Sequence, residues 1–202
     1  MTAPDLDTLV GRTTGLQPWR RLFHAATGSL VAGILLYADV PRAVAAGILG
    51  AVLGGLVVLD VTRLVSPGAN ALFFRAFRTL ASPREARRPA SSTWYALGMT
   101  LAVAFFSPEA AVSGILVLAL ADPAASYVGQ RWGRRPLLGA SLEGTAVFAA
   151  VAFAVLGARH GLLPGAAGAL AVALAERLSW PLDDNLTIPV VAAAVVTLIP
   201  GA

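Results

Sequence analysis

Long apolar segments separated by short polar ones constrain the fold of this chain more than any other feature. Hydrophobic residues make up 57% of the sequence and charged residues 13%. In soluble domains, about half of the residues are apolar and about a quarter are charged. Because a helix needs about 20 mostly apolar residues to cross a membrane, we expect an all-α polytopic membrane protein with about seven transmembrane helices. The expected spans are 23–38, 42–61, 92–106, 109–121, 144–156, 163–178 and 186–199.

One further helix, between Ser66 and Ser91, is expected to lie along the membrane surface. Its apolar side chains recur at helical spacing, and its arginines fall on the opposite face, which is typical of an interfacial amphipathic helix. The apolar positions are Leu72, Phe73, Ala76, Phe77 and Leu80, and the arginines are Arg75 and Arg78.

The arginines predict how the chain is oriented. All 15 basic residues are Arg. If the loops alternate between the two sides, all of them except Arg42 and Arg159 fall on the side of the N-terminus. Because basic loops favour the cytoplasmic side, we expect an integral membrane protein with a cytoplasmic N-terminus and the C-terminus outside. Residues 1–18 would form a polar cytoplasmic tail, and 19–202 a single transmembrane domain.

The stretch 120–145 carries the most specific pattern. Asp122 and Pro123 follow one another at the end of a long apolar segment. A proline suits the first position of a helix, and an aspartate is a good N-cap. We therefore expect the helix to break at Ala121–Asp122 and to restart at Pro123.

Beyond this point, small residues recur every four positions at Ala125, Gly129 and Gly133. Residues at this spacing share one helical face, so a ligand could approach the backbone there. Acids at the rim of a membrane helix are costly and usually face a cavity or a partner. Six acids lie at the cytoplasmic ends of the expected spans: Asp60, Asp122, Glu143, Glu176, Asp183 and Asp184. Together with the nearby arginines, they indicate a cytoplasmic site for a phosphate chain and a divalent metal.

Each of these features also has a simpler structural interpretation. The small-residue face could be a packing seam between helices, and Asp184 or Asn185 could cap the last helix. Asp60 and Arg63 could form a structural ion pair, or Arg63 could contact a nucleotide. His24 could act as a general base for a hydroxyl, or it could bind a backbone carbonyl.

The order of these motifs resembles the CTP-dependent lipid kinases, namely dolichol kinase, phytol kinase and the yeast-type diacylglycerol kinase. The central match, D-x-x-A-x-x-x-G-x-x-x-G followed by S-L-E-G, falls on Asp122, Ala125, Gly129, Gly133, Ser141, Glu143 and Gly144. The flanking matches are R-x-x-H-x-x-x-G through His24 and Gly28, L-D-V-T-R-L at 59–64, and an E…D-N-x-x-x-P pattern through Glu176, Asp184, Asn185 and Pro189. These matches run in order over nearly the whole chain after the tail.

The resemblance implies a kinase that moves the γ-phosphoryl group of CTP to a lipid alcohol, such as phytol or another prenol, or a polyprenol such as dolichol. The catalytic residues would then be His24, Asp122, Glu143 and Asp184, of which the three acids would hold Mg²⁺ or another divalent cation. The nucleotide-binding residues would be Arg63, Ala125, Gly129, Gly133, Arg134, Ser141, Gly144 and Asn185. The partners would be the bilayer, the lipid alcohol and the nucleotide, with no nucleic acid, and we also consider a homodimer.

One position departs from the family pattern, because Ala140 stands where the family usually has a Lys before the Ser. We expect Arg134 to supply the missing charge, since an Arg can grip phosphate oxygens with two donors.

Two other functions are also considered. A cytidylyltransferase acting on phosphatidate has a related signature, but LDDNLTIP stands near the C-terminus in place of its D-R-x-D-S type cluster. A small non-enzymatic carrier would not explain why the acids gather on one side.

Overall fold

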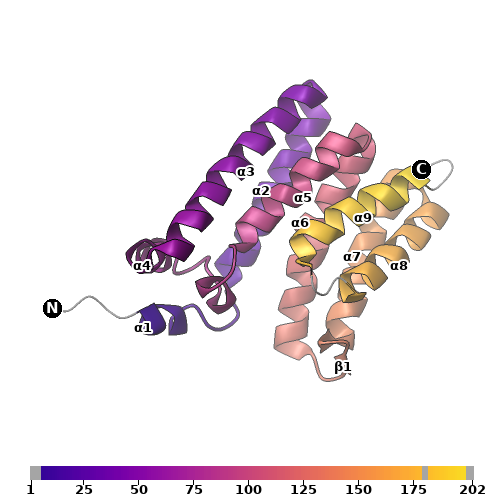
Figure 1. Ribbon diagram of the computed structural model, residues 1–202. Coiled ribbons are helices and arrows are strands. Elements are labelled where there is room, and N and C mark those ends of the chain that lie inside the picture. The colour runs from indigo at the N-terminus through magenta and orange to yellow at the C-terminus, as the bar shows by residue number, and fades with distance from the viewer. Residues whose placement is uncertain (1–5, 179–181, 199–202) are drawn as a thin grey trace.

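The computed structural model describes residues 6–178 and 182–198, and these form a bundle of helices with one short β-hairpin (Figure 1). The α-helices are α1 (Leu6–Gly11), α2 (Pro18–Tyr37), α3 (Arg42–Val65), α4 (Pro67–Ala76), α5 (Ser91–Phe105), α6 (Pro108–Trp132), α7 (Leu142–His160), α8 (Leu162–Leu178) and α9 (Asp184–Leu198). A short 3₁₀ helix, η1 (Pro83–Ala86), precedes α5, and strands β1 (Pro136–Leu137) and β2 (Ala140–Ser141) form an antiparallel hairpin between α6 and α7.

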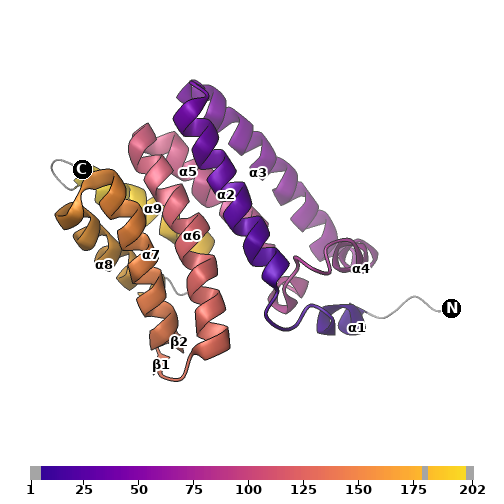
Figure 2. The ribbon, with the colours of Figure 1, turned by 180° about the vertical axis from the view of Figure 1, so that it is seen from behind.

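Helix α6 forms the core of the bundle and contacts α2, α7 and α9. Helix α3 packs on α5 at one flank, and α8 packs on α7 and α9 at the other (Figures 1 and 2). The side chains of Ile115, Val117 and Leu118 in α6 are fully buried, as are Phe148 in α7 and Ile188 in α9. The residues that follow this core in α6 are therefore held in a fixed position.

Three of the described helices, α3, α6 and α7, are long and apolar enough to cross a membrane. Each of the seven spans expected from the sequence overlaps one helix. The ends differ by a few residues, except that α6 continues 11 residues beyond the expected end of its span, to Trp132. The first five residues of the expected tail and the C-terminal residues 199–202 lie outside the described residues.

The expected break at Ala121–Asp122 is wrong. Helix α6 is continuous from Pro108 to Trp132, with Pro123 in its interior, so Asp122 caps no helix. An internal proline costs a helix about 3 kcal/mol because one backbone hydrogen bond is lost. The buried residues on both sides of Pro123, Ala121 and Ala125 among them, pack against the neighbouring helices and offset this cost.

The described part of the expected tail is folded onto the bundle. Helix α1 packs on α4, where Leu9, Phe74 and Ala81 form a small buried cluster of their own. The side-chain amide of Gln17 donates to the carbonyl of Ala81 at 2.6 Å. These contacts hold α1, α4 and η1 together, at the end of the bundle where the β-hairpin also lies (Figure 1).

Candidate functional site

Two adjoining cavities open at this end of the bundle. The smaller, of about 430 Å³, lies between α2, α6 and the segment 13–17. The larger, of about 980 Å³, lies between α6, the β-hairpin and the facing ends of α7, α8 and α9. Arg84, Ser126 and Gln130 line both cavities, so these three residues form a shared wall.

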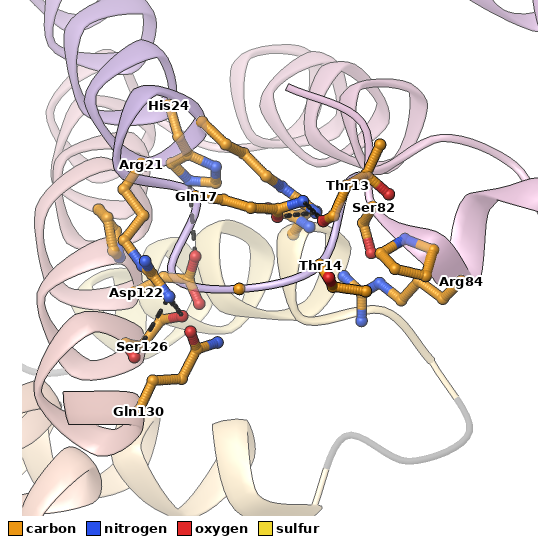
Figure 3. A pocket seen from close by; sticks show the side chains of 15 residues that line it. Thr13, Thr14, Gln17, Arg21, His24, Ser82, Arg84, Asp122, Ser126 and Gln130 are labelled. Atoms are coloured by element: carbon orange, nitrogen blue, oxygen red, sulfur yellow. Dashed lines mark hydrogen bonds and ion pairs between the residues drawn. The ribbon is translucent and has the colours of Figure 1, made fainter. Parts of the chain in front are cut away.

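His24 and Asp122 face one another in the smaller cavity (Figure 3). The Nε2 atom of His24 lies 3.9 Å from Oδ2 of Asp122, which is too far for a hydrogen bond. This nitrogen is buried and has no hydrogen-bond partner among the described residues. Tyr95 holds the start of α2 in place, because its hydroxyl donates to the His24 carbonyl at 2.8 Å. The cavity therefore presents an unsatisfied nitrogen beside a carboxylate, which is an arrangement suited to binding a hydroxyl group.

Two arginines of α2 add positive charge to the smaller cavity. Arg21 donates from Nη2 to Ser126 Oγ at 3.1 Å, while its Nη1 is buried without a partner among the described residues. Arg20 lies 3.3 Å from the buried carboxylate of Glu85 and donates to Ser91 Oγ at 2.6 Å. Burial lowers the pKa of the Arg20 guanidinium, and the Glu85 carboxylate offsets only part of this shift. Both guanidinium groups are charged at neutral pH and attract an anion.

The larger cavity contains the start of α7. The Ser141 side chain accepts the backbone N–H of Gly144 at 3.1 Å and so caps the helix. Ser141, Gly144 and Thr145 line the cavity together with Arg88 and Arg177. A helix N-terminus beside arginines favours phosphate groups, because the backbone N–H groups and the helix dipole both attract negative charge.

The glycines of the 120–145 stretch pack α6 against α7. A Cβ atom on Gly144 would lie 3.0 Å from the Ala125 carbonyl oxygen, and one on Gly133 would lie 2.7 Å from Ser141 Cβ. A Cβ atom on Gly129 would lie 3.0 Å from Ser141 Oγ. The simpler interpretation, a packing seam, therefore holds, although Ala125, Gly129 and Gly144 also line the larger cavity.

The comparisons with known proteins agree with the resemblance to the CTP-dependent lipid kinases. CTP-dependent diacylglycerol kinase 1 of Schizosaccharomyces pombe is 30% identical over 165 residues, which cover 69% of this chain and 74% of that protein. Phytol kinase of Synechocystis is 33% identical over 188 residues, which cover 84% of this chain and 74% of that protein. The chain belongs to the CTP-dependent lipid kinase family.

Not every member matches over its full length. The chain spans 36% of CTP-dependent diacylglycerol kinase 1 of Eremothecium gossypii, at 30% identity over 118 residues. No family model matches the chain. No solved structure matches it either.

The three acids expected of a lipid kinase site are divided between different surroundings. Asp122 lines the smaller cavity and Asp184 the larger, whereas Glu143 lines neither. Oε2 of Glu143 accepts the backbone N–H groups of Arg134 and Arg135 at 3.1 and 3.3 Å. Among the described residues, no group of three His, Cys, Asp or Glu side chains could hold a metal ion by itself. A metal held jointly by these three acids thus stays a prediction.

The start of α9 is capped differently from our expectation. Oδ1 of Asp183, and neither Asp184 nor Asn185, provides the cap by accepting the Asn185 backbone N–H at 3.1 Å. The same oxygen accepts from the Asn185 side chain at 2.7 Å, and Asn185 lines the smaller cavity. The carbonyl oxygen of Asn185 would lie only 2.3 Å from a Cβ atom on Gly98. The start of α9 therefore packs closely against α5 at Gly98.

Arg63 is a structural residue in this fold. Its side chain is 3% exposed, and Nε donates to Asp60 Oδ1 at 2.6 Å. Its Nη1 and Nη2 atoms donate to the carbonyls of Glu85 and Arg88, both at 2.6 Å. Arg63 lines neither cavity, so of its two expected roles the geometry favours the structural ion pair over the nucleotide contact.

Arg134 also lines neither cavity, whereas Ala140 lines the larger one. The cations that share this cavity with Ala140 are Arg84, Arg88 and Arg177. Sequence reasoning did not assign Arg84 or the segment 13–17 to the site. The basic residues before α5, Arg84, Arg87 and Arg88, are a signal that could have pointed to this site, but a cluster of this kind can equally well bind anionic lipid headgroups.

Proposed function

We propose that this protein is a CTP-dependent kinase that transfers the γ-phosphoryl group of CTP to the hydroxyl of a membrane lipid alcohol. The observation that carries the proposal is the pair of adjoining cavities with a shared wall. One presents His24 and Asp122 to a hydroxyl group, and the other presents a helix N-terminus and arginines to phosphates. Membership of the CTP-dependent lipid kinase family supports the choice of nucleotide.

In this proposal the triphosphate of CTP occupies the larger cavity. The start of α7 and the guanidinium groups of Arg88 and Arg177 face the phosphate oxygens and bind the triphosphate. The nucleotide-binding role expected for Ser141, Gly144 and Gly129 is kept here, since all three line this cavity. Asn185 is assigned to the acceptor side, because it lines the smaller cavity.

The lipid hydroxyl enters the smaller cavity between His24 and Asp122. One of these two groups accepts the hydroxyl proton, the hydroxyl oxygen forms a bond to the γ-phosphorus, and the bond from that phosphorus to the β–γ bridging oxygen breaks. The products are CDP and a lipid phosphate, so atoms and charges balance. Positioned acid–base groups of this kind contribute about 10²–10⁴-fold to a rate.

A magnesium ion fits the donor chemistry of the two cavities. Mg²⁺ prefers oxygen ligands and is usually held by one or two carboxylates together with substrate phosphates. Asp122 and Asp184 could provide these carboxylates, one from each cavity. When bound, the ion would neutralise charge on the phosphate oxygens. Glu143, the third expected ligand, would instead hold the backbone of the loop before β1.

For the acceptor we propose a prenol such as phytol or a polyprenol. The Synechocystis relative named phytol kinase matches 84% of this chain, more than the diacylglycerol kinases do. Diacylglycerol is the alternative acceptor, which the names of those fungal relatives favour.

We further propose that seven helices, α2, α3 and α5–α9, cross the membrane with the N-terminus and both cavities on the cytoplasmic side. The loops alternate between the two ends of the bundle (Figures 1 and 2), and the arginines gather at the end that bears the cavities. Reporter fusions at Asp39, Glu109 and Arg159 should all report the outer side. A cytoplasmic signal at any of these positions would contradict the topology. The homodimer that we consider would use α3, where a Cβ atom on Gly47 or Gly50 would meet no described atom within 4 Å.

The test of the activity is purified protein with labelled CTP, Mg²⁺ and a panel of phytol, a polyprenol and diacylglycerol. A kinase releases CDP and a lipid phosphate. Release of pyrophosphate with phosphatidate as acceptor would identify a cytidylyltransferase instead. The absence of any nucleotide-derived product would favour a non-enzymatic carrier.

A further inference from the structure

Arg84 occupies a special place between the two cavities. Of the three residues in the shared wall it is the charged one, since Ser126 and Gln130 are neutral. Ser126 and Gln130 belong to α6, whereas Arg84 belongs to η1 and faces them from the other side of the smaller cavity (Figure 3). A group that passes from a donor in the larger cavity to an acceptor in the smaller one must therefore pass beside Arg84.

The backbone that carries Arg84 is held firmly. The buried carboxylate of Glu85 accepts the backbone N–H groups of Ser82 and Ser91, both at 3.2 Å. Arg63 binds the carbonyls of Glu85 and Arg88, as described above. These buried contacts fix both sides of position 84, so the side chain extends from a rigid support.

The guanidinium group of Arg84, by contrast, makes few contacts with the protein. The side chain is 58% exposed, and Nη2 donates to Ser91 Oγ at 3.2 Å. The same atom lies 3.8 Å from Oδ2 of Asp183, beyond hydrogen-bond distance. The other carboxylate oxygen of Asp183 is occupied by the two hydrogen bonds from Asn185. A guanidinium group has five N–H donors, so most of those of Arg84 remain available for a ligand.

The other arginines of the site lack this combination. Arg20 and Arg21 line the smaller cavity alone and are bound to Glu85 and Ser126, respectively. Arg88 and Arg177 line the larger cavity alone, and Arg177 forms an ion pair with Glu176. Among the described residues, Arg84 is therefore the charged side chain that lines both cavities and can contact a phosphoryl group passing between them.

We propose that Arg84 is a catalytic residue that contacts the transferring γ-phosphoryl group and stabilises the charge on its oxygens in the transition state. This inference rests on the proposed kinase function. A phosphoryl group in transfer spreads its charge over three equatorial oxygens, and a planar guanidinium matches two of them at once. Because this contact forms between the cavities, it acts on the chemical step more than on the binding of CTP.

The experiment compares four single variants of the full chain with CTP and the acceptor that the wild type uses. Removal of one charge-stabilising donor costs roughly 10²–10³-fold in kcat, so Arg84→Ala should lose that much, with the KM for CTP changed by less than about threefold. Arg84→Lys should recover part of kcat, because an ammonium supplies the charge without the planar pair of donors. Arg88→Ala should raise the KM for CTP and spare kcat. Arg87→Ala, whose exposed side chain lines neither cavity, should match the wild type.

Three results would overturn the proposal. An Arg84→Ala variant with wild-type kcat would show that the group transfers without Arg84. An effect confined to the KM for CTP would make Arg84 a nucleotide-binding residue. A melting temperature lowered in parallel with activity, in Arg84→Lys as well as in Arg84→Ala, would make it structural. If the wild type forms no CDP with any alcohol, the proposed kinase function is wrong. The role proposed for Arg84 then fails with it.

Discussion

The Nε2 atom of His24 and the Oδ2 atom of Asp122 lie 3.9 Å apart across the smaller cavity. At this separation a single oxygen atom can lie within hydrogen-bond distance of both, although they do not bond to each other. The two residues come from different helices, α2 and α6, which pack directly against one another. The pair is thus the place where we propose that one lipid hydroxyl group binds.

If both residues act on the same hydroxyl, Asp122→Asn should lower kcat by roughly 10²–10⁴-fold. The fold should survive, because Asp122 caps no helix and Asn has nearly the same volume. Adding His24→Gln should cause little further loss, since groups that act as a unit are not additive. CDP release at saturating CTP measures the loss. Asp39→Asn, in the loop between α2 and α3, is the control and should be fully active. Fully additive losses in the double variant would contradict a shared hydroxyl.

Glu143 offers a test between a metal ligand and a structural anchor. If its carboxylate serves to accept the backbone N–H groups of Arg134 and Arg135, an amide oxygen can replace it. Glu143→Gln should then keep activity within about threefold of the wild type, while Glu143→Ala loses more because the loop before β1 loses its side-chain anchor. The measurement is turnover as a function of Mg²⁺ concentration. A large rise in the Mg²⁺ requirement of Glu143→Gln would restore Glu143 as a metal ligand.

Gly28 belongs to the family-like motif that contains His24, and its role is steric. A Cβ atom at this position would lie 2.2 Å from Tyr95 Oη and 2.6 Å from Ala119 Cβ. Gly28→Ala should therefore lower the free energy of unfolding by about 1–3 kcal/mol through overpacking. Gly33→Ala, in the same helix with no described atom within 4 Å of its Cβ position, is the matched control. Thermal melting in detergent compares the two, and equal melting temperatures would contradict the packing.

These cases show how far the sequence could lead. The apolar segments predicted the helices, because burial in a bundle follows the pattern of hydrophobic residues directly. The motifs predicted that Asp122, Glu143 and Asp184 share one cytoplasmic site. The structure places Asp122 and Asp184 in two adjoining cavities at one end of the bundle, and Glu143 in neither of them. The sequence could not predict that α6 continues through Pro123, since this depends on packing from four other helices, α2, α5, α7 and α9.

The sequence also could not predict that Arg84 and the segment 13–17 line the site. Those residues approach α6 only because α1 packs on α4 and because Glu85 and Arg63 fix the loop before α5. The contact of α1 with α4 and the contact of Arg63 with Glu85 both join positions far apart in the chain. Such contacts cannot be predicted from a local sequence pattern.

Arg63 and Asp60 should prove essential for stability and not for nucleotide binding. Asp60 Oδ2 also accepts from the backbone of Ala90 and from Thr93 Oγ1, at 2.9 and 2.6 Å. Breaking such a buried pair typically costs about 3–5 kcal/mol, so Asp60→Asn should melt at a clearly lower temperature. The fraction that remains folded should keep the wild-type KM for CTP. A raised KM without a loss of stability would favour the nucleotide contact instead.

The final prediction concerns Ala140, where the chain departs from the family pattern. We expected Arg134 to supply the missing charge, but its side chain lines neither cavity, and its backbone N–H is bound by Glu143. Arg134→Ala should therefore leave CTP turnover within about twofold, because a solvated surface charge contributes little. Ala140 does line the larger cavity. Ala140→Lys should add a cation near the phosphates and lower the KM for CTP by up to roughly tenfold, the value of one charge-assisted hydrogen bond.

Steady-state kinetics on both variants and on their combination decide between the two arginine assignments. If Arg134 faced the phosphates, its removal would raise the KM for CTP, and Ala140→Lys would rescue the loss. If Arg84, Arg88 and Arg177 supply the charge, the gain from Ala140→Lys is the same with or without Arg134. The second outcome follows from the larger cavity, where Ala140 already lies among those three cations.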